Sequence, residues 1–570
     1  MKNIRGIIST TGKGVGYIND EKNPLPEDIE IQTAFLNTAL NGDEVEIILH
    51  PHTKGVRQSG EVIKIIKRAK DTFVGVLECS KNLCFLVADD RKMYVDIFLQ
   101  KGNSPQLKTG VKAQVKITKW EKSQKNPQGE IIKILGEKGE HNVEMESIVL
   151  EKGFDIKFPT EVEKDAEKIE NNKKITQEEI NQRKDFRNTL TFTIDPFDAK
   201  DFDDAISFKE LEGNLFEIGV HIADVSHYVI PNTALDKEAL SRGCSIYLVD
   251  RTIPMLPEVL SNDVCSLNPN EDKLTFSAVF VMDTEGVVHE RWFGKTIINS
   301  NKRFTYENAQ ESIDKGGEYT EELQILNKIA KKLQLEKFKA GAIEFEQDEI
   351  KFKLDENFKP IGVYKKARLD THKLVEEYML LANREVAKYI YDSIKKKGGK
   401  SIASIYRIHD TPDREKIENL AILVKALGYE LPIKEKGVSQ RDINALLKKI
   451  EGKAEEGLIK TAAIRSMAKA IYSVDNVGHF GLAFEYYTHF TSPIRRYPDL
   501  LVQRILQAHL SGAKMGDKDF IQYSHIAQKS TEREIAAAEA ERASKKYKQV
   551  EYMKEKVGQE FTGIISGVTE

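Results

Sequence analysis

The chain has 570 residues, a length that exceeds one hydrophobic core and indicates three or more domains. Hydrophobic residues make up 40% and charged residues 31%, which excludes a disordered chain and favours a globular protein. The net charge of −4 neither supports nor excludes a nucleic-acid partner, because a polyanion is bound by a local basic surface and not by the total charge. Lys and Arg are dense in residues 365–414 and 465–504.

The four cysteines Cys79, Cys84, Cys244 and Cys265 show no CxxC spacing, which argues against a zinc ribbon. We expect no disulfides and a reducing compartment. The first residues contain no apolar leader segment, and no apolar run reaches the length that spans a membrane. The sequence therefore predicts a cytoplasmic protein that has no membrane partner.

Two copies of one small β module are expected in the first 140 residues. Short runs of alternating apolar residues, broken by Gly, Asn and Asp, occur in 5–47 and again in 74–117. Such runs are typical of small barrels. The strand 13–18, with Tyr17 between glycine and isoleucine, resembles the RNA-facing strand of cold-shock domains, where aromatic rings stack on bases. An ordinary barrel with structural glycines stays open as the alternative.

Residues 141 to about 190 are charged and partly helical, and we interpret them as a connector. Strands are expected from Leu190 onward and helices from about Tyr319. A long helix is predicted over 530–556, which is rich in Ala, Glu and Lys. The last residues resemble the first strand of an S1-type barrel, which the sequence does not complete.

The strongest chemical signal is a cluster of aspartates. Residues 193–205 read TIDPFDAKDFDDA, with five aspartates between two strand-like segments. Pro196 favours an extended conformation at Asp195, so a turn after it can bring Asp195 opposite the later aspartates. Carboxylates this close together repel one another and raise one another's pKa values unless a cation compensates.

Clustered carboxylate oxygens suit Mg²⁺, for which Mn²⁺ can substitute, better than they suit zinc. Nucleases use such clusters to activate water and to stabilise the leaving oxygen. The alternatives are a calcium loop and a solvated acidic turn. The ligand spacing of an EF-hand is absent. A solvated turn would not need the apolar residues Ile194, Phe202 and Ala205 that frame this cluster.

The aspartate segment resembles the signature of the ribonuclease II and ribonuclease R family, and is closer to ribonuclease R. Further matching segments follow in the family's order: HIADVS at 221–226, SRGCSIYL at 241–248, RTIPMLP at 251–257, EEYMLLAN at 376–383, YRIH at 406–409 and HFTSPIRRYPDL at 489–500. The resemblance covers nearly the whole chain. It implies a hydrolytic, processive 3′-to-5′ exoribonuclease that acts in RNA turnover and quality control. The products would be nucleoside 5′-monophosphates and a short limit oligonucleotide.

Site residues follow from the same resemblance. It identifies Asp195, Asp201, Asp203 and Asp204 as the catalytic, metal-binding aspartates. It identifies Arg495 and Arg496 as catalytic residues that contact the phosphate, and Tyr247 as a tyrosine that stacks near the 3′ end. It gives Tyr306, Glu376 and Glu377 as further RNA contacts. Asp198 lies where the signature varies, so we interpret it as a supporting or structural residue.

Several of these residues have less specific alternatives. Tyr247 could be a core aromatic on a β segment, and an exposed arginine pair is often only a solvated surface. His221, His409 and His489 lie in apolar or helical contexts without ligand spacing, so we interpret them as structural or as RNA contacts.

The resemblance implies a multidomain α+β fold. Residues 1–60 and 61–140 would be cold-shock-like barrels, 141–556 the catalytic RNB domain with a helical connector, and 557–570 the start of an S1 barrel. The expected partner is the 3′ end of single-stranded RNA, with structured RNA as a further candidate, and the chain is expected to be a monomer. Two rivals remain: a non-catalytic RNA-binding adaptor with a degenerate nuclease core, and a metal-dependent endonuclease of unrelated fold.

Overall fold

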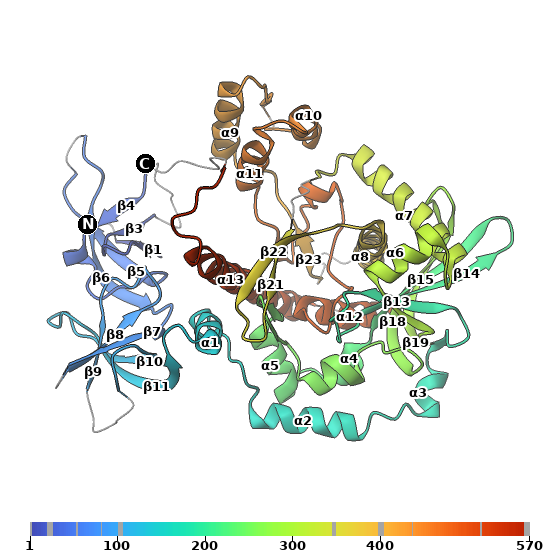
Figure 1. Cartoon of the computed structure of the whole chain (residues 1–570), viewed down its shortest axis with the longest axis horizontal. Coiled ribbons are helices and arrows are strands. Elements are labelled where there is room, and N and C mark those ends of the chain that lie inside the picture. Colours follow the sequence, from blue (N-terminus) through green and yellow to red (C-terminus); the bar gives the residue numbers. More distant parts are fainter. Residues whose placement is uncertain are drawn as a thin grey trace. The chain divides into compact units, whose positions relative to one another are not determined.

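A computed structural model of the chain describes residues 3–19, 27–52, 55–80, 83–100, 107–344, 349–396, 404–435, 437–513 and 516–563. The chain divides into two compact units, which are shown in Figure 1 and described separately below. The first consists of residues 1–157 and 539–546, and the second of residues 158–538 and 547–570.

The first unit begins with a small β module made of two three-stranded sheets. Their orders are β1-β5-β6 and β2-β3-β4. The strands are β1 (Ile4–Ile7), β2 (Ser9–Thr10), β3 (Gly16–Ile18), β4 (Ile29–Ile31), β5 (Glu44–Leu49) and β6 (Gly60–Lys67), with a short 3₁₀ turn at Thr33–Phe35. Alternate residues of these strands point into one core that includes Ile8, Ile29 and Val45. Because β6 pairs with β5, this module extends to Lys67 and not to the expected boundary near residue 60.

A closed five-stranded barrel follows, with strand order β10-β11-β9-β8-β7. Its strands are β7 (Thr72–Cys79), β8 (Leu83–Ala88), β9 (Ile97–Gln100), β10 (Val111–Lys119) and β11 (Gln128–Glu137). Helix α1 (His141–Glu151) packs on this barrel, where Glu144 forms a buried ion pair with Lys112 and Glu151 accepts a hydrogen bond from the backbone of Val74. Two β modules were expected from the sequence, and both are present.

The expectation of no disulfides is wrong for one pair, because the structure joins Cys79 to Cys84. The two residues are direct cross-strand partners in the β7–β8 hairpin, with their Cα atoms 4.1 Å apart. The spacing in sequence did not reveal this, because only the hairpin register places residues five apart on facing positions. Cys244 and Cys265 are free thiols.

The second unit is built on a seven-stranded mixed sheet of order β12-β19-β18-β15-β14-β13-β20. The strands are β12 (Lys184–Asp185), β13 (Thr191–Asp195), β14 (Asp204–Leu211), β15 (Leu215–Ala223), β18 (Asp272–Asp283), β19 (Val288–Asn299) and β20 (Lys302–Thr305). Strands β13 and β20 run parallel, and β13 is buried along its whole length. The central strands carry apolar residues on both faces because the core of this unit covers them.

Helices pack around this sheet. Helices α6, α7 and α8 contact one another, α8 contacts β15, and α12 contacts both α4 and α8, as Figure 1 shows. The helix bounds are α2 (Thr160–Asn171), α3 (Gln177–Asn181), α4 (Val225–Tyr228), α5 (Ala234–Arg242), α6 (Tyr306–Lys315), α7 (Thr320–Ala340), α8 (Asp370–Lys396) and α12 (Tyr497–Leu510), with a π-helical turn at Leu260–Val264. Strands were expected to predominate from Leu190 and helices from about Tyr319. Both do so, although α4, α5 and α6 precede Tyr319 and four short strands between residues 349 and 473 follow it.

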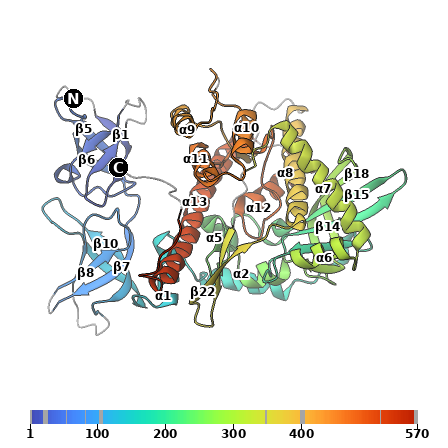
Figure 2. The ribbon, with the colours of Figure 1, turned by 45° about the horizontal axis from the view of Figure 1, so that its top comes forward.

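Three helices, α9 (Arg414–Ala426), α10 (Gln440–Ile450) and α11 (Glu456–Ser466), share a core of their own. Figure 2 shows this group away from the seven-stranded sheet. Three two-stranded pairs complete the unit, namely β16 (Ile246–Tyr247) with β17 (Thr252–Ile253), β21 (Glu349–Leu354) with β22 (Pro360–Lys366), and β23 (Tyr406–Ile408) with β24 (Ile471–Ser473); a 3₁₀ turn lies at Phe480–Leu482.

The predicted C-terminal helix is α13 (Asp517–Lys554). It begins earlier than expected, because Tyr523 and Ile526 add buried turns that pack into the main core. The expected first strand of an S1 barrel is not seen in residues 557–563, and residues 564–570 lie outside the described part. Among the described residues, no helix is long and apolar enough to cross a membrane.

Candidate active site

The aspartate cluster lies at one edge of the seven-stranded sheet. Asp195 is the last residue of β13 and Asp204 is the first residue of β14, and these two antiparallel strands are neighbours. The loop between them therefore returns Asp201 and Asp203 to the edge from which Asp195 leaves. The expectation that Asp195 faces the later aspartates across a small loop agrees with this placement.

Side chains from distant segments hold the loop. The hydroxyl of Ser266 accepts a hydrogen bond from the backbone of Phe202 and donates one to the carbonyl of Lys200. The guanidinium of Arg303, on β20, donates to the carbonyls of Pro196 and Phe197. Both ends of the loop are fixed by these bonds, which reduces the conformational freedom of the carboxylates.

Burial and mutual repulsion disfavour the charged forms of these carboxylates. Burial, followed by the nearby charge of Asp204, raises the pKa of Asp195 to about 8. Burial also raises the pKa of Asp204 to about 6, although the charges of Arg495 and Arg496 act in the opposite direction. Burial is also the largest cause of the raised pKa values of Asp201 and Asp203. A bound cation would favour the charged forms of these carboxylates, above all that of Asp195.

The chemistry of the candidate ligands suits a hard cation, but their spacing does not complete a metal site. Every candidate ligand is a carboxylate, and the Oδ2 atom of Asp195 is buried without a hydrogen-bond partner among the described residues. Nevertheless, no three acidic, His or Cys side chains in the described ranges lie close enough together to hold an ion. The aspartates are therefore gathered at one edge of the sheet, but they do not form a closed cage.

Asp203 links this loop to a second one. It is only 3% exposed. Its Oδ1 atom accepts a hydrogen bond from the backbone of Ile494 at 2.8 Å, and its Oδ2 atom lies 3.3 Å from the Nε atom of Arg495. The two segments are 291 residues apart in sequence. Asp203 thus connects the aspartate loop directly to the Ser-Pro-Ile-Arg-Arg segment.

The two arginines of that segment have different surroundings. The side chain of Arg495 is 42% exposed and contacts Asp203 and the hydroxyl of Ser492. The guanidinium of Arg496 instead forms a two-pronged ion pair with buried Asp499, with N–O distances of 2.9 and 2.7 Å. The two arginines are adjacent in one sequence motif, whereas in the fold they have different partners.

Tyr247 lies beside the same arginine. The backbone of residues 243–245 pairs with 495–497, through hydrogen bonds from Ser245 to Arg495 and from Tyr497 to Gly243. Gly243 has a φ of +71°, and a side chain there would press on Arg533. Tyr247 follows on β16 and is 39% exposed, which argues against a core aromatic. Burial raises the pKa of the Tyr247 hydroxyl to about 12, and the charge of Arg495, which lies close to it, acts in the opposite direction.

Known protein families match most of this chain. The RNB domain profile matches residues 183–512, and a cold shock domain profile matches 85–159. Ribonuclease R 1 of Lactococcus lactis is 35% identical over 99% of this chain and 71% of its own length, and ribonuclease R of Aquifex aeolicus is 34% identical over 99% and 79%. The chain belongs to the ribonuclease II and ribonuclease R family.

Solved structures of the family extend the likeness to the fold. Mycoplasma genitalium RNase R in complex with ribose-methylated single-stranded RNA superposes with a TM-score of 0.90 at 27% identity, covering 99% of this chain and 89% of its own. Yeast Ssd1, described as a pseudonuclease, is 18% identical with a TM-score of 0.71, covering 95% of this chain and 73% of its own, so it shares the fold alone. Because a protein described as a pseudonuclease also has this fold, the fold alone does not establish nuclease activity, and the site residues have to supply it.

The other residues that the family resemblance suggested lie at varying depths. Tyr306 begins α6 directly after Thr305, which pairs with Asp195 in the parallel β13–β20 ladder. The ring of Tyr306 stacks on the ring of His372, with their centroids 3.9 Å apart. Burial raises the pKa of Tyr306, and so do the charges of Asp204 and Asp195, which places the ring near the cluster.

Glu376 and Glu377 are neighbours on α8 but differ in exposure. The side chain of Glu376 is 40% exposed and pairs with Arg368, whereas Glu377 is buried in an ion pair with Lys337 of α7. Successive residues of a helix point about 100° apart, so one faces solvent and the other the helix interface. Tyr17, on β3 of the first unit, is half-buried and lies under the guanidinium of Arg57.

The three histidines that were interpreted as structural or as RNA contacts have protein partners. His221 is buried between the hydroxyls of Ser207 and Ser277, and burial lowers its pKa to about 3. His489 bonds to the hydroxyl of Tyr472.

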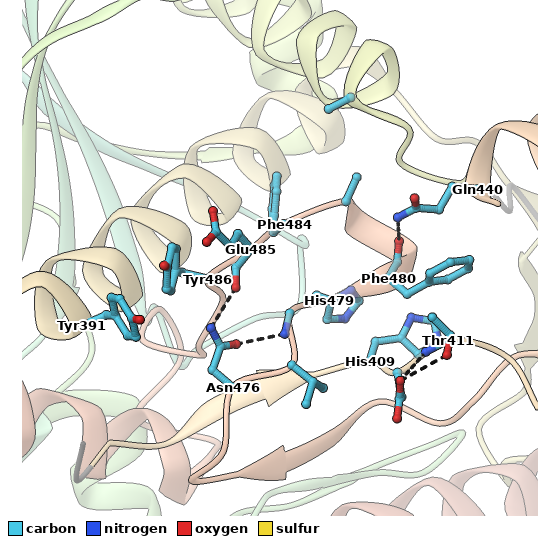
Figure 3. A pocket seen from close by; sticks show the side chains of 15 residues that line it. Tyr391, His409, Thr411, Gln440, Asn476, His479, Phe480, Phe484, Glu485 and Tyr486 are labelled. Carbon is cyan, nitrogen blue, oxygen red and sulfur yellow. Dashed lines mark hydrogen bonds between the residues drawn. The ribbon is translucent and has the colours of Figure 1, made fainter. Parts of the chain in front are cut away.

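His409 lines a pocket of about 600 Å³ that also includes Tyr391, His479, Phe484 and Tyr486 (Figure 3). Its ring nitrogens bond to the backbone of Gly481 and Ala468, so it presents no free ligand atom. No Lys or Arg is among the described residues that line this pocket, so its walls offer no cation to a phosphate.

Sequence reasoning missed the residues that hold the site in place. These are Ser266, Arg303, Asp499 and Asn383, whose side-chain oxygen accepts a hydrogen bond from the backbone of Phe490. Asn383 and Asp499 lie inside motifs that match the family, so their positions were visible although their roles were not. No local signal in the sequence marks Ser266 or Arg303, because each acts across a long sequence separation.

Proposed function

We propose that this chain is a hydrolytic, processive 3′-to-5′ exoribonuclease that releases nucleoside 5′-monophosphates and leaves a short limit oligonucleotide. The observation that supports it best is the contact of Asp203 with Ile494 and Arg495, which joins an acidic loop to a cationic one at the edge of the sheet. An acidic cluster beside an available guanidinium suits the cleavage of a phosphodiester.

Asp195, Asp201 and Asp204 are the proposed ligands of Mg²⁺, or of Mn²⁺ in its place, and their carboxylates would have to move closer together to hold the ion. When bound, the ion would supply a polarised water and stabilise charge on the leaving oxygen. Asp203 orients the backbone of Ile494 and the side chain of Arg495. Arg495 binds the phosphate, because a guanidinium stays charged and offers several donors in a plane.

Aromatic residues would hold the RNA near its 3′ end. Tyr247 is half-exposed beside Arg495, so its ring is available to stack on a base. Tyr306 closes the site next to Asp195, and exposed Glu376 is a candidate contact with RNA. Tyr17 would stack on RNA that reaches the first barrel. Single-stranded 3′ ends are the proposed substrate, and structured RNA a further one.

The function is tested with RNA labelled at its 5′ end, with and without Mg²⁺, beside a circular RNA of the same sequence. We expect the linear RNA to shorten to a limit product with release of mononucleotides, while the circular RNA stays intact. Cutting of the circle would indicate an endonuclease. Binding of both RNAs without any product would indicate the non-catalytic adaptor.

Replacing Tyr247 with alanine should lengthen the limit product while long RNA is still degraded. One stacked base contributes about 1–3 kcal/mol, a loss that a short oligonucleotide cannot offset with other phosphate contacts. Gel analysis of the limit products, together with a thermal melt, checks this. Tyr247→Phe is the matched control and should keep the wild-type product length, because the ring is retained.

If Tyr247 were instead a core aromatic, the alanine variant should lose about 3–5 kcal/mol of stability. Melting temperature and activity would then fall together, with the product length unchanged.

A further inference from the structure

The segment 490–496, which carries both arginines, is fixed by three buried side chains from three different places in the fold. Asn383 of α8 accepts a hydrogen bond from the backbone of Phe490 at 2.7 Å. Asp499 of α12 accepts one from the backbone of Ser492 at 2.8 Å, and Asp203 accepts one from Ile494. Three hydrogen bonds to its backbone leave this segment little freedom to move, which fixes the positions from which the two arginine side chains extend.

Asp499 has the largest share of these contacts. Its side chain is fully buried, and its two oxygens accept from the backbone of Ser492 and from both Nε and Nη2 of Arg496. It lies in the first turn of α12, where the positive end of the helix dipole favours a carboxylate. Both oxygens of this carboxylate therefore accept hydrogen bonds from protein donors.

These contacts make the two arginines unequally available to a phosphate. Two donors of Arg496 are committed to Asp499, and its side chain is 22% exposed. Arg495 is 42% exposed, and its longest contact, with Asp203, is 3.3 Å. A phosphate could therefore reach Arg495 without displacing a two-pronged ion pair, because this side chain has only one longer contact with a carboxylate. Reaching Arg496 in the same way would compete with its two bonds to Asp499.

We propose that Arg496 and Asp499 are a positioning pair that fixes the 492–496 turn, and that Arg495 alone of the two arginines binds the phosphate. The proposal rests on the proposed function, because it assigns roles within that active site. Asp499 acts through Arg495 and through the bond from Ile494 to Asp203, and it does not touch the substrate.

The main test is a double-mutant cycle in single-turnover cleavage of a short RNA. Asp499→Asn keeps the shape and one acceptor but loses the charge that holds Arg496. We expect it to lower the cleavage rate about tenfold to a hundredfold in the wild-type background, since misplacing a catalytic group by about 1 Å has an effect of this size. In the Arg495→Ala background the same change should lower the rate less than about threefold, because the arginine that Asp499 positions is no longer there.

A purely structural role predicts a different pattern. Asp499→Asn would then lower the melting temperature and leave the rate of the folded enzyme unchanged, or lower the rate equally in both backgrounds. Either result overturns the proposal. If Asp499→Asn does not fold, Arg496→Lys takes its place in the cycle with the same expectations, because lysine keeps the charge but lacks the two-pronged geometry.

The salt dependence of RNA binding gives a readout that does not need activity. The double variant Arg496→Met/Asp499→Asn removes both charges together, so the slope of log K against log salt should stay as in wild type. Arg495→Ala should reduce that slope by about 0.7, the value for one phosphate contact on a single strand. A similar reduction in the double variant would show that Arg496 binds phosphate and would overturn the proposal.

Asp236→Asn is the matched control for all of these measurements. Asp236 of α5 pairs with Arg504 further along α12, at 2.8 Å, and accepts a hydrogen bond from the hydroxyl of Tyr497. Among the described residues it does not contact Asp203, Arg495 or Arg496. It should lower the melting temperature without changing the cleavage rate at lower temperature. If wild type itself releases no nucleotide, the proposed function fails instead, and the salt slopes alone decide between the two arginines.

Discussion

Replacing Asp203 with asparagine is expected to lower the turnover number by at least about a thousandfold, which corresponds to roughly 4 kcal/mol of transition-state stabilisation. Asparagine keeps an acceptor for the backbone of Ile494 but places an uncharged group against Arg495, which is 3.3 Å from the carboxylate in wild type. Binding of long single-stranded RNA should change less than about threefold, because most of that affinity comes from phosphate contacts elsewhere.

Rates of mononucleotide release and filter-binding affinities, measured on the same preparation, check this result. Asp198→Asn is the control, since Asp198 is exposed in the same loop. It should leave both quantities near wild type. An Asp203→Asn enzyme that keeps more than about a tenth of the wild-type rate would contradict an essential role for this carboxylate.

Withdrawal of divalent metal is expected to have an equally large effect. EDTA should abolish turnover, and Mg²⁺ or Mn²⁺ should restore it. The Mg²⁺ concentration needed for half-maximal activity should fall as the pH rises from about 6 to about 8, because protons on Asp204 and Asp195, with pKa values of about 6 and about 8, must leave before a cation can bind. Titrations of Mg²⁺ at several pH values measure this directly.

The same pKa shifts predict a stability effect whose sign can be worked out. In the folded, metal-free protein Asp195 keeps its proton up to a pH of about 8, whereas in the unfolded chain it loses it near pH 4. Between these values the folded state binds more protons, so the free energy of unfolding decreases as the pH rises. Added Mg²⁺ should therefore raise the melting temperature more at pH 8 than at pH 5.

Asp195→Asn separates the two roles of this carboxylate. The variant should be inactive, yet more stable than metal-free wild type at pH 8, because a neutral amide replaces a buried charge. Thermal melts with and without Mg²⁺ decide the matter. Activity that persists in EDTA, or a wild-type melting temperature that does not respond to Mg²⁺ at pH 8, would contradict the assignment of the metal ligands.

Several pairs of neighbours show the limit of what motifs predict. Arg495 and Arg496 are adjacent and chemically identical, but only the second forms a two-pronged ion pair, with buried Asp499, whereas the first has a single longer contact with Asp203. Glu376 and Glu377 are adjacent on one helix and both lie within reach of Lys337, but only the second is buried against it. Cys79 and Cys84 are joined only because a hairpin register brings them opposite each other.

The sequence by itself determined the family, the two β modules, the strand-rich and helix-rich parts of the catalytic unit and the place of the aspartate cluster. These follow from local periodicity and from motifs whose residues lie within a dozen positions of one another. The tertiary structure alone decided the bond from Asp203 to Ile494, the pairing of Arg496 with Asp499, the support of the aspartate loop by Ser266 and Arg303, and the depth of Tyr247. Most of these contacts join residues far apart in sequence, and no local pattern specifies which distant side chain a buried group will meet.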